Sequence, residues 1–223
     1  VLELSPSIAL LDGESSFLTN EWPTPLPTFL DDLRRVRLRQ HAPLVGDKSP
    51  LHFALGAAHV ALAALLFPHA KVVITTREPV ERAWSEVKLF GRRRVTDASI
   101  AAALGNGMLP NWLGEAIKNS RYLQHARTWT EHFGERVLLL QSEEFERDVH
   151  ANCARLFDWL SLEPPDDSAI ARLQKNWSNR TANYRREPAL GALLEKMCGD
   201  EIFEVPDLET ALAMTPNLLK AAP

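Results

Sequence analysis

The segment from Lys71 to Ser85 constrains the fold of this chain more than any other. It opens with a run of β-branched residues that has the length and composition of a buried strand. The run ends at Arg77, turns through Pro79 and continues as an amphipathic segment carrying Ser85. A guanidinium binds phosphate through paired donors, and amides at a helix start add more. We therefore expect Arg77 and Ser85 to converge on one anion, although a purely structural βα junction has the same pattern.

The overall composition is that of an ordinary globular protein. Of the 223 residues, 45% are hydrophobic and 24% are charged, which is enough to form the core of one α/β domain. The formal net charge of -4 argues against a general nucleic-acid binder. Cys153 and Cys198 lie far apart in apolar helical patterns, so we expect two buried thiols rather than a disulfide or a metal site.

Strands and helices are predicted to alternate, which favours one mainly parallel sheet covered by helices on both faces. The predicted strands are 44–47, 71–76 and 136–141. The predicted helices are 31–40, 50–67 with Ser49 as its cap, 80–91, about 120–133, 149–160 and 189–197. Glu143-Glu144 are expected to cap or brace the following turn rather than to take part in chemistry. Arg77 is expected at the carboxyl edge of the sheet, where open parallel sheets bind ligands.

Three segments occur in an order that resembles a known family. They are Val45-Gly-Asp-Lys-Ser-Pro-Leu-His-Phe53, similar to E-K-(S/T)-P-x-Y; Phe67 to Ser85, similar to P-x-A-K-hydrophobic-R-(D/E)-P-x-E-R-x-x-S; and Ser120 to Phe145, similar to a Y-x-x-x-L-x-x-W-x-x-x-F helix with its strand and acidic turn. This order resembles sulfotransferases that use 3′-phosphoadenylyl sulfate (PAPS), especially heparan-sulfate-type O-sulfotransferases and their bacterial counterparts. The resemblance spans about Leu2 to Met197.

The resemblance implies a three-layer α/β fold of the P-loop sulfotransferase type over residues 1–223, as a single domain. It implies transfer of a sulfuryl group from PAPS to a hydroxyl or amine of a glycan or small-molecule acceptor, in a loose, in-line displacement analogous to phosphoryl transfer. The family opens with a strand, a Gly-rich 5′-phosphosulfate loop and a helix. Val1 to Ile8 resembles the end of that helix. We therefore expect the first βα unit to be missing and this stretch alone to be inactive.

Three residues are candidates for the reacting centre. Asp12-Gly-Glu14-Ser-Ser-Phe17 resembles the family's E-x-x-F-F segment, whose Glu is the proposed general base. A carboxylate beside a bound hydroxyl can accept its proton as the oxygen attacks. Lys48 matches the family's catalytic lysine, which neutralises charge on the bridging oxygen. His52 competes with Glu14 because a neutral imidazole is also a competent base, although a partly buried core histidine has the same pattern.

The nucleotide phosphates are expected to contact two parts of the chain. The resemblance places Arg77 and Ser85 on the 3′-phosphate. Arg180, Tyr184 and Arg185 lie where the family has a basic loop over the nucleotide, although the loop is shorter here and lacks the usual Lys-Gly pair. The expected co-substrate is PAPS, the expected product is 3′,5′-adenosine diphosphate, and no metal is expected.

Two other functions remain open. One is a catalytically inactive domain of the same fold that binds a nucleotide or a protein partner. The other is a nucleotide kinase-like phosphotransferase, which is disfavoured because no Walker loop or acidic magnesium pair is evident. No nucleic-acid partner, signal peptide or membrane span is expected, so we favour a cytoplasmic, bacterial-type protein over one of the Golgi lumen.

Overall fold

The computed structural model describes residues 2–19, 24–91, 98, 102, 111–175 and 188–198. Contacts between Cα atoms divide the chain into two compact units. The first is drawn from Val1–Val72, His132–Leu138 and Glu144–Ser178, and the second from Val73–Glu131, Leu139–Glu143 and Asn179–Pro223. Strands β3 and β4 each pass from one unit into the other. The single-domain organisation stays a prediction.

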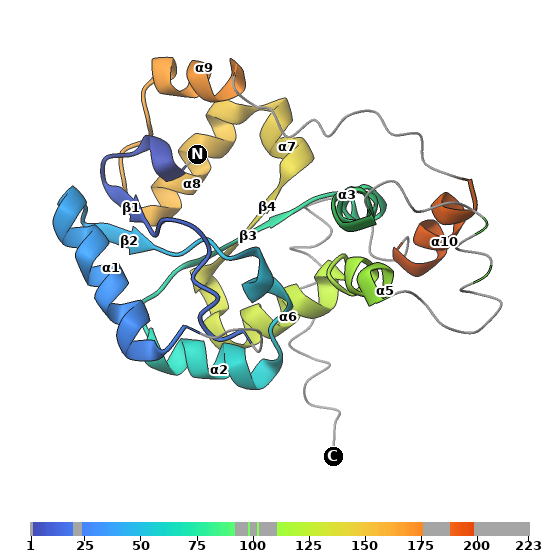
Figure 1. The fold of residues 1–223 in the computed structure, drawn as a ribbon. Helices are drawn as coiled ribbons and strands as arrows, with labels where there is room; N and C mark the ends of the chain where they lie inside the picture. Colours follow the sequence, from blue (N-terminus) through green and yellow to red (C-terminus); the bar gives the residue numbers. More distant parts are fainter. Residues whose placement is uncertain are drawn as a thin grey trace. The chain divides into compact units, whose positions relative to one another are not determined.

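The first unit contains a pair of short parallel strands beside a long helix (Figure 1). Its elements are η1 (Leu2–Leu4), β1 (Ile8–Leu10), α1 (Leu26–Gln40), β2 (Leu44–Gly46), η2 (Pro50–Ala54), α2 (Ala57–Leu66), η3 (Gly134–Arg136), most of α7 (Ser142–Arg147), α8 (Val149–Leu160) and α9 (Asp167–Lys175). Proline in the first turn of α1 suits its start, because those amides have no partner within the helix. The strands pair Ala9 with Val45, and Ala9 is fully buried against α1 residue Val36.

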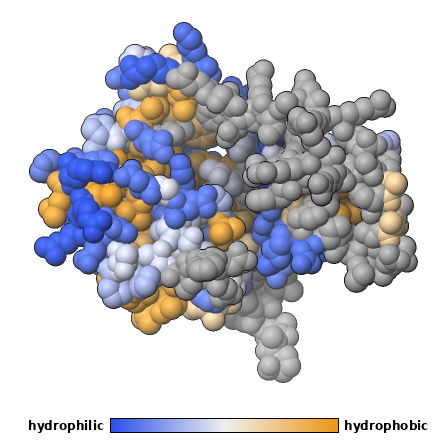
Figure 2. Space-filling view, viewed as in Figure 1, coloured by the Kyte–Doolittle hydropathy of each residue, from blue (hydrophilic) through white to orange (hydrophobic). Residues whose placement is uncertain are grey.

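Three aromatic rings pack together in this unit. The rings of Phe17 and Phe29 stack at 4.2 Å, and both meet the ring of Phe67 edge-on. This packing fixes the loop after β1 against α1 and the end of α2. Figure 2 shows hydrophilic residues gathered over α1 and hydrophobic residues over α2.

The second unit is a helical cluster beside a strand pair. Its elements are β3 (Val72–Thr76), α3 (Pro79–Gly91), α5 (Asn111–Lys118), nearly all of α6 (Tyr122–Phe133), β4 (Val137–Gln141) and α10 (Pro188–Cys198). Helices α3, α5 and α10 pack together around one apolar core, made by Val80, Ala83, Val87, Leu113, Ala116, Ile117, Leu190, Leu194 and Cys198. Cys153 of the first unit and Cys198 of the second are both buried thiols, as predicted, and burial raises the pKa of the Cys153 thiol.

Three structural expectations were wrong in detail. The strands join in two hydrogen-bonded pairs, β1 with β2 and β3 with β4, rather than in one ladder. The predicted helix 50–67 is a 3₁₀ turn followed by α2, because Leu55 and Gly56 are extended. Within Val1 to Ile8, which the resemblance predicted as the end of a helix, Leu2–Leu4 form a 3₁₀ turn and Ile8 begins β1. A three-residue strand is too short to show the alternation that marks longer ones.

The start of α8 offers a direct test of local capping. Asp148 precedes the helix, and its carboxylate accepts a hydrogen bond of 2.9 Å from the amide of Ala151. We expect Asp148→Ala to lower the free energy of unfolding by about 1 kcal/mol, because one helix-start amide loses its partner. Asp158→Ala, an exposed change later in the same helix, is the control and is expected to change it by less than about 0.5 kcal/mol. Urea titration measures both, and equal losses would contradict the capping role.

Candidate functional site

Asp47, the residue after β2, forms the centre of a polar cluster in the first unit. Its Oδ2 accepts a 2.6 Å hydrogen bond from the Ser15 hydroxyl. The Ser49 hydroxyl lies 3.2 Å from the same oxygen, and it also accepts a 3.0 Å hydrogen bond from the Ser15 amide. We call Ser15, Asp47, Ser49 and His52 the Asp47 cluster. It connects the loop after β1 with the turn after β2, so the two predicted catalytic segments lie together.

Ser49 does not cap the helix that follows it. It stands at the N-cap position of η2, but its side chain makes no cap hydrogen bond. The hydroxyl is used instead by Asp47 and by the Ser15 amide, which is 34 residues away in sequence. The predicted cap is therefore wrong, because a long-range partner takes the hydroxyl.

His52 is partly buried within the Asp47 cluster. Its Nδ1 lies 3.5 Å from Oδ2 of Asp47, and its side chain is 20% exposed. Burial lowers the pKa of His52, while the carboxylate of Asp47, the main chain of Phe17 and the carboxylate of Glu14 all raise it. Its Nε2 is buried and has no hydrogen-bond partner. A neutral, partly buried imidazole results.

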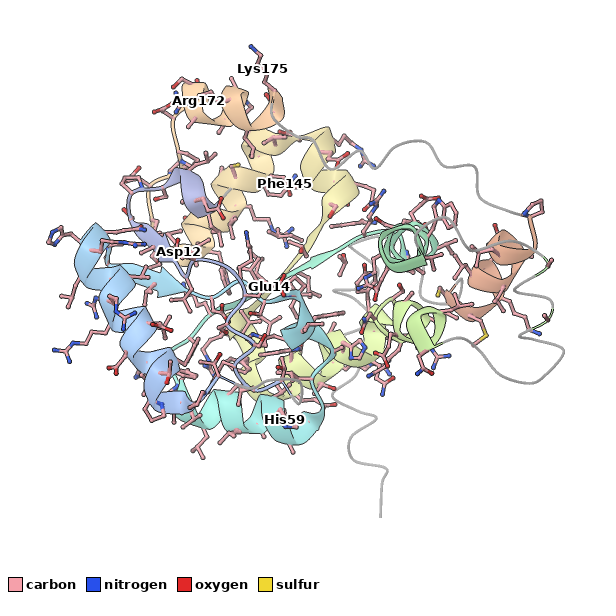
Figure 3. All side chains as sticks on the ribbon, in the orientation of Figure 1. Asp12, Glu14, His59, Phe145, Arg172 and Lys175 are labelled. Carbon is pink, nitrogen blue, oxygen red and sulfur yellow. The ribbon has the colours of Figure 1, made fainter. Side chains whose placement is uncertain are left out.

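Glu14 and Lys48 are adjacent in sequence to Ser15 and Asp47 of this cluster, and both are exposed. Glu14 precedes Ser15 in the loop after β1 (Figure 3). Its charge raises the pKa of His52. Lys48 follows Asp47, and its Nζ lies 3.2 Å from the carboxylate of Glu3, in a pair whose side chains are each 66% exposed. A pair this open to water is weak, so the ammonium remains accessible to an anion.

Arg77 is the first residue after β3 in the second unit, and carboxylates hold the turn that carries it. Glu143 Oε1 accepts a 2.9 Å hydrogen bond from the Glu78 amide and lies 4.0 Å from Arg77 Nε. The carboxylate of Glu78 in turn accepts from the amides of Val80 and Glu81, at 3.0 and 2.6 Å. The helix-start amides that were expected to bind the anion therefore already donate to the Glu78 carboxylate, which caps the start of the helix. Glu143 braces this turn rather than its own.

Ser85 lies half-buried in the second turn of α3. The neighbouring Arg82 of the same motif has a structural role. Its guanidinium donates to the Ala116 carbonyl and the Ser120 hydroxyl at 3.2 and 3.3 Å, and it pairs with Glu86 one turn on. These bonds fix α3 against α5, so Arg82 is engaged while the side chain of Arg77 is 44% exposed.

Several predicted features are not described by the structure or were missed. Arg180, Tyr184 and Arg185 lie outside the described residues. Among the residues that are described, no group of three or more His, Cys, Asp or Glu side chains could hold a metal ion, and no helix is long and apolar enough to cross a membrane. Motif order alone assigned no role to Ser15 or Asp47. The only sequence signal for these two residues was that each is a short polar residue within one of the two motif segments.

Comparison with known proteins identifies the family. The model of the sulfotransferase family matches residues 26–167, more than half of the chain, so the chain belongs to the sulfotransferase family. The chain is also similar to the crystal structure of a sulfotransferase from Alicyclobacillus acidocaldarius, with a TM-score of 0.67 and 19% identity over 95% of this chain and 88% of that chain. No curated protein matches. The structural likeness confirms the expected α/β fold of the sulfotransferase type.

Tyr122, at the start of α6, gives a test of how closely the Arg77 turn is packed. Burial raises the pKa of Tyr122 to about 12, and the Glu143 charge adds to this effect, whereas the Arg82 charge and the main chain and charge of Arg77 lower the pKa. The folded state therefore keeps the phenol proton that the unfolded state loses near pH 10.0. We expect this contribution to be complete below pH 10 and lost between pH 10 and 12.

The measurement is urea unfolding at pH 9 and at pH 11 in the wild type and in Tyr122→Phe. The variant lacks the titrating group, so its free energy of unfolding is expected to fall less across this interval. Parallel pH dependence in the two proteins would show that Tyr122 is not protected from ionisation.

Proposed function

We propose that this chain transfers a sulfuryl group from PAPS to a hydroxyl or amine of a glycan or small-molecule acceptor. The family assignment supports sulfuryl transfer. The observation that carries the choice of donor is Arg77, which follows β3 directly and has an exposed guanidinium on a braced turn. Such a side chain suits a terminal phosphate, and the 3′-phosphate distinguishes PAPS from other adenylyl donors. As a bacterial-type enzyme it would act in the cytoplasm.

The donor contact depends on side chains because the nearest helix amides are occupied. Val80 and Glu81 already donate to Glu78. Arg77 then supplies the charged contact with the 3′-phosphate, and Ser85 adds a hydroxyl from α3. Glu143 keeps Arg77 in place through the Glu78 amide, but at 4.0 Å its own carboxylate pairs only loosely with the guanidinium.

The acceptor chemistry is assigned to the exposed groups beside the Asp47 cluster. The acceptor oxygen or nitrogen forms a bond to sulfur as the bond from sulfur to the bridging phosphate oxygen breaks, leaving 3′,5′-adenosine diphosphate. Glu14 takes the acceptor's proton, and the ammonium of Lys48 neutralises the charge that develops on the bridging oxygen. Glu14 is favoured over His52 because it is exposed, whereas Nε2 of His52 is buried.

Nucleotide affinity tests the donor assignment. Arg77→Ala is expected to weaken binding of 3′,5′-adenosine diphosphate by about 1.5–3 kcal/mol, the range for hydrogen bonds to charged groups. Ser85→Ala is expected to weaken it less, because only a neutral hydroxyl is lost. The matched control is Arg121→Ala, which removes an exposed arginine elsewhere in the same unit. Calorimetry decides the matter, and equal wild-type affinity for adenosine 5′-monophosphate would count against a 3′-phosphate site.

Turnover tests the proton acceptor. In a complete enzyme, Glu14→Gln is expected to lower kcat by about 10²–10⁴ with nucleotide affinity nearly unchanged, because the amide cannot accept the proton. His52→Ala is expected to have a milder effect, and Asp12→Asn, an exposed change in the same loop, serves as the control. Transfer from radiolabelled PAPS to a panel of acceptors is the assay. A larger loss in the His52 variant would reassign the base, and no transfer in the wild type would favour an inactive binding domain.

A further inference from the structure

The carboxylate of Asp47 is unusual among the charged groups of the first unit because it is nearly buried. Its side chain is 11% exposed, and its contacts come from two segments far apart in sequence. Removing a carboxylate from water is unfavourable unless donors surround it. Here the donors are the hydroxyls of Ser15 and Ser49, and Nδ1 of His52 lies 3.5 Å from the same carboxylate. Such a group is expected to fix a specific geometry rather than to add stability.

The Asp47 carboxylate fixes the loop that carries Glu14 relative to the turn that carries Lys48. Ser15 connects the loop after β1 with the turn after β2. Its hydroxyl donates to the Asp47 carboxylate, and its amide donates to the Ser49 hydroxyl. The Ser15 hydroxyl also accepts a hydrogen bond of 3.2 Å from the Phe17 amide, which orders the rest of the loop. The hydrogen-bonded residues Ser15 and Asp47 are adjacent in sequence to Glu14 and Lys48, respectively. The side chains of Glu14 and Lys48 are exposed.

Positioning matters for this reaction because a loose displacement gains mainly from alignment. Glu14 is joined to Ser15 by one peptide bond, and Lys48 is joined to Asp47 in the same way. A shift between the two loops therefore moves the proton acceptor relative to the cation. A misplacement of about 1 Å can lower a rate about 10²-fold.

His52 reports on the same carboxylate. Two charged groups act on its imidazole, Asp47 at 3.5 Å from Nδ1 and the exposed Glu14, and both raise its pKa against the larger effect of burial. Replacing Asp47 with a neutral isostere removes one of the two. The pKa of His52 should then fall further below its ordinary value of 6.5.

We infer that Asp47 is a positioning residue for sulfuryl transfer, which holds the Glu14 loop and the Lys48 turn together through Ser15 and Ser49. The inference rests on the proposed function, because it assigns the proton acceptor and the cation to these loops. Asp47 itself does not touch the substrate. It acts by keeping two exposed side chains at a fixed separation.

The test uses Asp47→Asn in the complete enzyme, with Asp31→Asn on the exposed surface of α1 as the matched control. We expect kcat to fall about 10–100-fold while KM for PAPS and the affinity for 3′,5′-adenosine diphosphate stay within about twofold. Ser15→Ala should lower kcat in the same way, and Ser15→Thr, which keeps the hydroxyl, should recover most of it. The control should match the wild type in every assay.

Two measurements without turnover complete the test. Hydrogen exchange at the Ser15 amide should be faster in Asp47→Asn, and the proton resonance of His52, assigned with His52→Gln, should titrate at lower pH than in the wild type. Absence of wild-type transfer to every acceptor would overturn the proposed function and this inference together. Wild-type transfer with unchanged kcat in Asp47→Asn, or unchanged exchange at Ser15, would overturn the role of Asp47 alone.

Discussion

The motif-bearing turns of this protein depend on carboxylates that satisfy the polar groups left open where a strand ends. A strand that leaves its ladder and enters a helix exposes amides with no partner in either element. Glu78 and Glu143 accept from these amides after β3. Asp47 performs a related task after β2, with hydroxyl donors in place of amides. Each turn is thereby fixed before any ligand binds, which is what a positioned reaction requires.

Some buried polar atoms in these turns have no hydrogen-bond partner. Oε2 of Glu143 and Nε2 of His52 are both buried and make no hydrogen bond. Buried atoms of this kind are rare in folded proteins and need a compensating reason. Both stand next to residues proposed to bind the donor or the acceptor. The free-energy cost of leaving these two atoms unpaired is consistent with turns arranged for chemistry rather than for stability alone.

The sequence predicted the elements whose pattern is local. The β-branched run gave β3, the apolar run before Gln141 gave β4, and Gly134, with a φ of +57°, ends α6 as expected. It missed elements whose stability is not local. Strand β1 has three residues and needs β2 to form a ladder, and α5 follows a Gly-rich stretch, with Gly114 inside it and a core shared with α3 and α10. Tertiary packing decides both.

The site shows the same division at the level of single side chains. Motif order located Arg77, Lys48 and Glu14, which are exposed and need no partner elsewhere in the chain to be recognised. It assigned no role to Asp47 or Arg82, which form long-range hydrogen bonds or ion pairs. Charged residues within one motif therefore separate by exposure. The exposed ones are those proposed to contact the nucleotide and the acceptor, and the less exposed ones pair within the fold, because a buried charge must already have its partners there.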